Sequence, residues 1–122
     1  MPEPASVLVT DDNSDLCETF SLILKRQGFD ADTASDGPSA VKKFTMHHSD
    51  VILLDFVMPE MNGLEAFRRI RQIDPAAKAI LMTAYCEEEL MKEALDEGIR
   101  CVISKPVKID QMMEIIKEAV LS

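Results

Sequence analysis

The sequence predicts an α/β fold, a doubly wound parallel sheet of five strands with five helices. Short β-rich runs alternate with longer segments of helical periodicity along the 122 residues. That alternation is typical of a parallel sheet covered by helices on both faces. A chain of this length has the size of one ordinary domain. We therefore expect a single domain over residues 1–122, with residues 1–5 as a short tail.

Five runs are predicted as strands because they are short, rich in apolar or β-branched residues and bounded by turn or polar residues. They cover residues 6–10, 30–34, 51–54, 79–82 and 101–103. The run at 51–54 reads Val-Ile-Leu-Leu without a polar residue. Such a run is typical of a central strand that is buried on both faces.

The five helices are predicted from apolar residues that recur three and four positions apart. Gly28 and Gly98 are expected to end the first and fourth helices. Acidic residues at 87–89 are expected to open the fourth helix, where they suit the positive end of the helix dipole. The apolar positions of the other four helices are Leu16, Phe20, Ile23 and Leu24; Ala40, Val41 and Phe44; Leu64, Phe67 and Ile70; and Ile109, Met112, Met113, Ile116 and Val120.

The composition excludes several classes of protein. A formal net charge of −9 argues against direct binding to nucleic acid, whose phosphates attract basic surfaces. Three widely spaced cysteines indicate neither a disulfide framework nor a zinc site, which favours a reducing, cytoplasmic setting. No apolar run approaches the roughly 20 residues that span a bilayer, so we expect no membrane association.

Polar residues follow four of the predicted strands at the end where functional sites of open α/β sheets lie. They are Asp11 and Asp12, Asp55, Thr83 and Lys105, after the first, third, fourth and fifth strands. Three neighbouring carboxylates repel one another, and a divalent cation relieves that repulsion. Oxygen ligands without His or Cys favour a hard ion, Mg²⁺ or Mn²⁺.

The same residues are suited to phosphoryl chemistry. The Lys105 ammonium and the Thr83 hydroxyl would join the metal in binding the phosphoryl oxygens, over which transition-state charge spreads. Asp55 is then the predicted nucleophile, forming an acyl phosphate.

In these motifs the chain resembles response-regulator receiver domains, over about residues 6–121. Each short motif is weak alone, but their order on successive strand ends is specific. The matching residues are Asp11-Asp12, Asp55, Met58-Pro59, Asn62-Gly63, Thr83-Ala84 and Lys105-Pro106.

The resemblance implies a flavodoxin-like receiver fold and a role for each site residue. Asp12 and Asp55 would bind the metal directly, Asp11 mainly through water, and Val57 through its backbone carbonyl. Thr83 and Lys105 would contact the phosphoryl oxygens. The Lys105-Pro106 peptide bond is expected to be cis.

The resemblance also implies partners. The phosphoryl donor would be a phosphohistidine on a sensor kinase or on a phosphotransfer protein. Phosphorylation would shift a face made by the fourth helix, the fifth strand and the last helix, and so control an output domain or a downstream protein. The domain would be a regulatory phosphoacceptor and not an enzyme in the usual sense, either as a monomer or as a phosphorylation-dependent dimer.

Three positions depart from the commonest pattern of the family. Val102 stands where an aromatic residue usually lies, three residues before the strand-five lysine, which puts the usual aromatic switch in doubt. Val57 and Tyr85 lie two residues after Asp55 and Thr83, at positions that flank the water that attacks the acyl phosphate. Neither side chain is a good activator of water.

Two other functions are compatible with parts of this pattern. Phosphatases of the haloacid dehalogenase kind also use an Asp nucleophile and Mg²⁺, but they require a second acid where this chain has Val57. A degenerate receiver that serves only as a binding module is the other alternative, and the intact set of Asp55, Thr83 and Lys105 argues against it.

Overall fold

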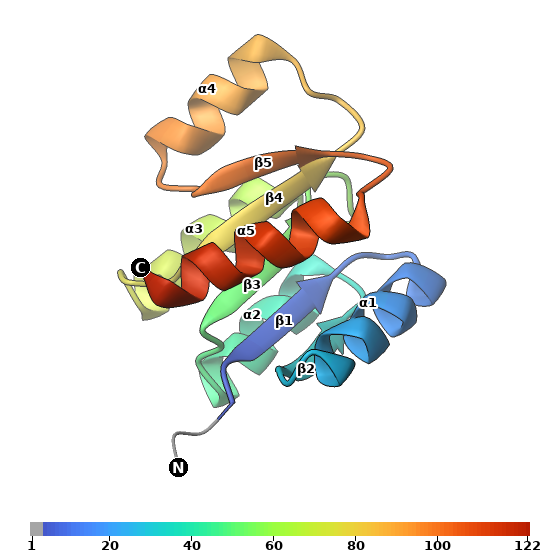
Figure 1. Cartoon of the computed structure of the whole chain (residues 1–122). Coiled ribbons are helices and arrows are strands. Elements are labelled where there is room, and N and C mark those ends of the chain that lie inside the picture. Colours follow the sequence, from blue (N-terminus) through green and yellow to red (C-terminus); the bar gives the residue numbers. More distant parts are fainter. Residues whose placement is uncertain (1–3) are drawn as a thin grey trace.

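A five-stranded parallel sheet forms the centre of the computed structural model, which describes residues 4–122 (Figure 1). The strands are ordered β2-β1-β3-β4-β5. Residues 1–3 of the expected tail lie outside the described part of the chain. The elements are β1 (Ser6–Thr10), α1 (Ser14–Arg26), β2 (Asp30–Ala34), α2 (Gly37–Met46), β3 (Val51–Asp55), α3 (Gly63–Ile73), β4 (Ala79–Thr83), α4 (Glu88–Asp96), β5 (Cys101–Ser104) and α5 (Ile109–Leu121).

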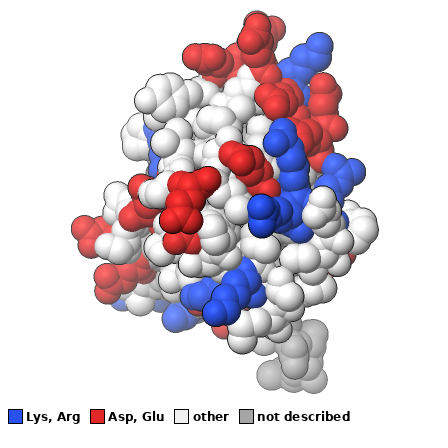
Figure 2. Space-filling model, turned by 180° about the vertical axis from the view of Figure 1, so that it is seen from behind, with Lys and Arg blue, Asp and Glu red and all other residues white. Residues whose placement is uncertain are grey.

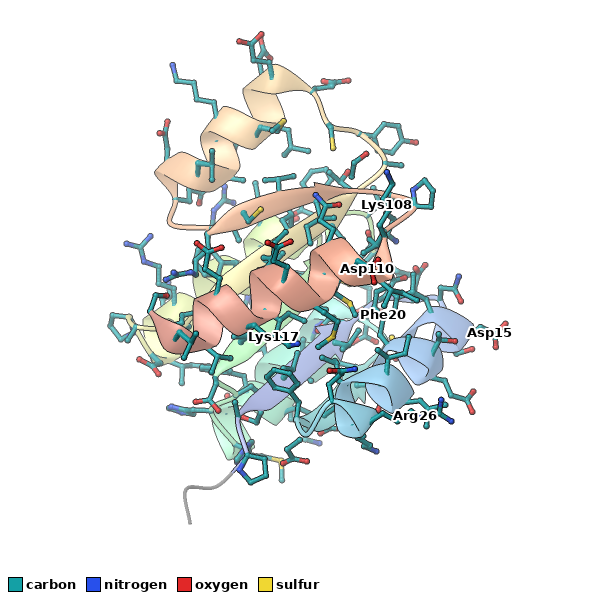
Figure 3. The ribbon with its side chains drawn as sticks, in the orientation of Figure 1. Asp15, Phe20, Arg26, Lys108, Asp110 and Lys117 are labelled. Carbon is teal, nitrogen blue, oxygen red and sulfur yellow. The ribbon has the colours of Figure 1, made fainter. Side chains whose placement is uncertain are left out.

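The helices form two layers around the sheet. α1 and α5 cover one face, and Phe20 lies between them, while the charged Asp15 and Arg26 lie on the exposed side of α1 (Figure 3). α2, α3 and α4 lie on the opposite face (Figure 1). Two separate apolar clusters result, one on each side of the sheet. The predicted doubly wound α/β fold is therefore confirmed.

The strands differ in burial according to their place in the sheet. β1, β3 and β4 are buried at every residue, as the apolar run at 51–54 predicted for β3. β2 and β5 lie at the two edges and are only partly covered. On the β2 edge, Lys43 of α2 donates to the carbonyl of Thr33 and pairs with Asp32. Charged side chains at a sheet edge, here Lys43 from the helix and Asp32 from the strand, oppose further strand pairing.

Local residues specify the start of the first three helices and the end of two helices. Asn13, Asp36 and Asn62 each accept a hydrogen bond from a backbone N–H in the first turn of the helix that follows. Gly28 and Gly98 follow α1 and α4 with φ of 92° and 106°, a conformation that favours glycine. Both predicted stops are thus confirmed. Within the described residues, no helix combines the length and the apolar character that a bilayer span requires.

Candidate functional site

Polar side chains from four strands meet at one edge of the sheet. β1 and β3 are neighbours in the parallel sheet, and β4 and β5 follow in order, so their carboxyl ends lie side by side. Asp55 ends β3 and Thr83 ends β4, whereas Asp11 and Lys105 come one residue after β1 and β5. The structure therefore brings together the residues that were predicted to meet there.

Three carboxylates form the acidic part of the site. One oxygen from each of Asp11, Asp12 and Asp55 lies within 4.8 Å of the other two. Asp11 and Asp55 are buried, with 1% and 5% of their surfaces exposed, whereas Asp12 is exposed. The cluster thus has an interior pair of acids and one acid that faces solvent.

Asp11 is held by two donors on opposite sides. The backbone N–H of Asn13 donates to its Oδ1 over 2.9 Å, and Lys105 Nζ donates to its Oδ2 over 2.7 Å. The Cys17 Sγ, from the first turn of α1, lies 3.3 Å from the Asp11 carbonyl oxygen, and burial raises the pKa of this thiol. The sequence did not predict that Asn13 and Cys17 contact Asp11, although an Asn at the start of a helix is a recognisable capping signal.

Lys105 bridges the two buried acids. Its Nζ lies 2.7 Å from Asp11 Oδ2 and 3.2 Å from Asp55 Oδ2. Burial alone would lower the pKa of Lys105, but the hydrogen bond to Asp11 and the charge of Asp55 outweigh it and raise the pKa above its ordinary value. The ammonium therefore stays charged and supplies a fixed positive charge beside Asp55.

Asp55 has the most perturbed acidity in the site. Desolvation by burial and the charge of Asp11 raise its pKa from 3.8 to about 6, against the opposing effect of Lys105. A carboxylate whose pKa is raised in this way gains from a further positive charge, because that charge relieves both the desolvation and the repulsion.

Thr83 is buried with its hydroxyl at the end of β4. Its Oγ1 accepts a hydrogen bond of 2.9 Å from the backbone N–H of Tyr85. Among residues 4–122 no acceptor is found for the hydroxyl proton itself, so that proton can be donated to a bound oxyanion. The contact with Tyr85 also links Thr83 to the segment that leads into α4.

The segment after Asp55 packs tightly against the strand. Gly63 begins α3, and a Cβ placed on it would lie 2.6 Å from the Asp55 carbonyl oxygen and 2.7 Å from Leu81 Cδ1. The capping box of Asn62 and Glu65 closes this turn. Only glycine therefore fits at this position. The Asn-Gly pair predicted a loop here but not this close packing.

The three departures from the expected pattern occupy distinct places. Val57 and Tyr85 are exposed, at 54% and 60%, on the loops that follow β3 and β4. Val102 is half-buried on β5 and packs against the apolar cluster on the α3 side of the sheet. The Lys105-Pro106 peptide bond is cis, which confirms that expectation.

The donor set fits a hard divalent cation. Asp11, Asp12 and Asp55 offer only carboxylate oxygens, and no His or Cys belongs to the cluster. Lys105 already neutralises part of the charge of the two buried acids through Asp11 Oδ2 and Asp55 Oδ2, whereas Asp12 is exposed and has no ion pair among residues 4–122.

Comparison with known proteins gives a consistent result. A model of the response regulator receiver domain matches residues 7–117. The chain is 32% identical over 113 residues to the chemotaxis protein CheY of Bacillus subtilis (strain 168). The matched region covers 92% of this chain and 94% of CheY. It is 35% identical over 113 residues to the regulatory protein AtoC of Escherichia coli (strain K12), covering 93% of this chain and 24% of AtoC. The chain thus spans about a quarter of that larger relative.

Solved structures show the same similarity. The chain resembles the CheX-CheY-BeF3-Mg+2 complex from Borrelia burgdorferi with a TM-score of 0.89 and 31% identity, covering 94% of this chain and 88% of that chain. It also resembles a CheY-like response regulator receiver domain protein from Methanospirillum hungatei JF-1, with a TM-score of 0.91 and 26% identity over 96% of this chain and 94% of that one.

Proposed function

This chain belongs to the response-regulator receiver family, and on that premise we propose that Asp55 accepts the phosphoryl group by which it signals. Phosphorylation-dependent signalling is the general role of the family. The observation that carries the proposal is the buried Asp55 carboxylate beside Lys105, with the two other acids within 4.8 Å. Apart from this chemistry on itself, the domain is a regulatory module and no enzyme.

The step is a displacement at phosphorus. An Asp55 oxygen attacks the phosphorus of a phosphohistidine, the new O–P bond forms, and the P–N bond breaks with its electron pair left on the imidazole. The Lys105 ammonium and the Thr83 hydroxyl, both at the same edge of the sheet, would donate to the equatorial phosphoryl oxygens. Their placement on strand ends keeps these donors in position before the phosphoryl group arrives.

Asp12 and Asp55 would hold the Mg²⁺ (or Mn²⁺) directly, with Asp11 acting through water and the Val57 carbonyl as a further ligand. When bound, the ion would neutralise charge on the acids and on the phosphoryl oxygens. The exposure of Asp12 and the occupation of both Asp11 oxygens by Asn13 and Lys105 support this division of roles. The similar complex from Borrelia burgdorferi contains both Mg and BeF3, which lends support by analogy.

The donor is proposed to be the phosphohistidine of a sensor kinase or a phosphotransfer protein in the cytoplasm. The signal would leave through Thr83, which contacts the phosphoryl group on one side and the Tyr85 backbone on the other. From there it would reach the face made by α4, β5 and α5, which controls an output domain or a downstream protein.

Acetyl phosphate with Mg²⁺ tests the assignment directly. Intact-mass spectrometry of the wild type is expected to show a labile gain of one phosphoryl group, which requires Mg²⁺. Asp55→Asn keeps the size of the side chain but loses the attacking oxygen, so it is expected to show no gain. Labelling that persists in Asp55→Asn would place the acceptor elsewhere, and no labelling of the wild type would leave a binding module without phosphoryl chemistry.

The phosphorylated form is expected to lose its phosphoryl group slowly. Attacking water must approach Asp55 in line and be oriented by a polar group, and Val57 offers none at the rim of the site. Val57→Asn and Tyr85→Glu are expected to change the lifetime measured by loss of the mass gain. Unchanged lifetimes in both variants would show that water is controlled by other residues.

A further inference from the structure

The loop between β3 and α3, residues 56–62, is fixed at both of its ends. The backbone N–H of Phe56 donates to the Met82 carbonyl over 2.8 Å, and the N–H of Gly63 donates to the Phe56 carbonyl over 2.9 Å. The loop therefore leaves the sheet and enters α3 at neighbouring points. The Val57 carbonyl, which is proposed as a metal ligand, belongs to this loop.

The tip of the loop has a strained backbone conformation. The N–H of Met61 donates over 2.7 Å to the carbonyl of Pro59, only two residues earlier, and Glu60 between them has a φ of 67°. Three-residue turns with a positive φ at the centre are rare and unfavourable for a residue that carries a side chain. Among residues 4–122, Glu60 is the only residue other than glycine with a positive φ. Its surroundings must therefore hold it in this conformation.

The Glu60 side chain does not supply that support. It is exposed and forms no ion pair among residues 4–122. Acidic side chains lie in several separate groups over the face of the molecule that carries α2 and α3, so an exposed acid is ordinary here (Figure 2). The conformation at Glu60 is therefore imposed by the packing of its neighbours in the chain.

The next residue, Met61, anchors the tip of the loop to the rest of the molecule. Only 8% of it is exposed, and it packs in the apolar cluster on the α3 side of the sheet. A Cβ placed on Gly37, the first residue of α2, would lie 2.8 Å from Met61 Cβ and 2.9 Å from Met61 Sδ. The Met61 side chain thus lies directly on the start of α2. That helix is a firm support, because Asp36 caps it and Phe44 is fully buried.

We propose that Met61 is a positioning residue for the metal site. Packed against Gly37, it keeps the strained turn at Glu60 closed and so fixes the backbone of the loop that carries the Val57 carbonyl. A loop that is already held in place loses little conformational freedom when an ion binds, which favours binding. This role rests on the proposed function for the identity of the ligand, because the Val57 carbonyl is itself a proposed ligand of Mg²⁺.

Magnesium affinity tests this role, with amide NMR shifts as the measure of binding. Met61→Ala removes the anchor and is expected to raise the Kd for Mg²⁺ about tenfold, the low end of the range for residues that orient metal ligands. Met61→Leu keeps the apolar bulk and is expected to bind within about twofold of the wild type. An unchanged Kd in Met61→Ala, or an equal loss in Met61→Leu, would overturn the proposal.

Met113→Ala is the matched control. Met113 is also a methionine with 8% of its surface exposed, but it packs in the apolar cluster on the opposite face of the sheet. The variant is expected to lose stability, as Met61→Ala does, and to keep the Mg²⁺ affinity of the wild type. An equal loss of affinity in Met113→Ala would show that general destabilisation controls binding, and the proposal would fall.

A double variant tests whether Met61 acts through the strained turn. Glycine adopts a positive φ without strain, so the turn needs less support in Glu60→Gly. When the two changes are combined, Glu60→Gly is expected to recover part of the affinity that Met61→Ala loses. Losses that simply add in the double variant would show that Met61 does not act through Glu60.

Hydrogen exchange separates this role from the proposed metal site, because it is measured without Mg²⁺. In Met61→Ala, protection of the residue 61 amide, which donates to Pro59, is expected to fall roughly tenfold relative to that of the Gly63 amide, as in a loop that opens locally. Met113→Ala is expected to keep the ratio of the wild type, and the same ratio in both variants would overturn the anchor. No Mg²⁺ binding by the wild type would instead refute the metal site, and exchange alone would then decide whether Met61 holds the turn.

Discussion

Helices α3 and α4 each follow a strand that carries a site residue, and they are attached to the sheet in opposite ways. α3 follows Asp55, begins with a capping box and buries five residues. α4 follows Thr83, lacks a side-chain cap and buries only Ala94. The same fold thus has one rigid connection after the proposed phosphoacceptor and one weak connection after the residue proposed to sense it.

The difference assigns separate tasks to the two connections. Gly63 lies so close to the Asp55 carbonyl oxygen that it has no space for a Cβ, and this packing fixes the backbone of the proposed acceptor. The exposed segment between Thr83 and α4 can change shape at little cost, because few buried contacts and no cap oppose it. A receiver needs both properties, since chemistry requires a fixed site and signalling requires an element with two accessible arrangements.

The largest expected effect on stability comes from truncating one apolar side chain in each of the two helices. Phe67→Ala in α3 removes a fully buried ring, and we expect the free energy of unfolding to fall by about 3–5 kcal/mol. Leu95→Ala in α4 removes a half-exposed side chain and is expected to cost less than about 1 kcal/mol. Urea denaturation measures both values. Similar losses in the two variants would mean that α4 is as firmly packed as α3.

The next largest effect comes from the buried carboxylate of Asp55. Without metal, the Asp55 pKa of about 6 lies above its ordinary 3.8, so the folded state binds more protons than the unfolded state between these values. Stability is then expected to fall as pH rises from about 4 to 6, by about 2–3 kcal/mol in total. Asp55→Asn should remove this slope and be the more stable protein at pH 8 in EDTA. A wild type whose stability rises through that interval would contradict the raised pKa.

Much of this arrangement follows from local sequence. The strand ends could be predicted because apolar runs stop abruptly at Asp11, Asp55 and Thr83, and parallel strands bring such ends together. The stops at Gly28 and Gly98 were equally visible, since each requires a positive φ. Such signals lie within a few residues of the feature that they specify.

Other features depend on contacts between distant segments. Asp11, the buried acid of the Asp11-Asp12 pair, binds Lys105 from the far end of the chain, and no local pattern predicts that contact. The low burial of α4 could not be predicted, because Leu90, Met91 and Leu95 have the spacing of an ordinary buried helix face. These residues are partly exposed in the structure, where α4 lies beside the edge strand β5. Arg68 pairs with Glu97, which lies 29 residues further along the chain, and no local pattern predicts this contact.

The third prediction compares Thr83, at the end of β4, with Val102 on the neighbouring strand β5. A hydrogen bond to a charged group is worth roughly 1.5–3 kcal/mol, so Thr83→Ala is expected to cut the active population with beryllofluoride about tenfold or more. Val102 is short and β-branched and cannot sweep out the volume of an aromatic ring, so Val102→Ala should change that population little. NMR shifts of the α4 amides report the population. Loss of the response in Val102→Ala with retention in Thr83→Ala would reverse the proposed route.

The smallest expected effect comes from exchanging the capping properties of the two helices. Asn62→Ala removes the side chain that accepts from Glu65 N–H, and we expect it to cost about 1 kcal/mol of stability. Glu87→Ser introduces a favoured N-cap where α4 has none, and it is expected to stabilise the protein by up to about 1 kcal/mol. Thermal melting measures both changes, with Glu88→Gln as a control for the loss of a negative charge beside the cap. Because a capped α4 resists displacement of its first turn, Glu87→Ser should also reduce the beryllofluoride-induced shifts there. A stabilised variant with an unreduced response would show that the first turn of α4 moves as an intact unit, and that its missing cap has no part in the switch.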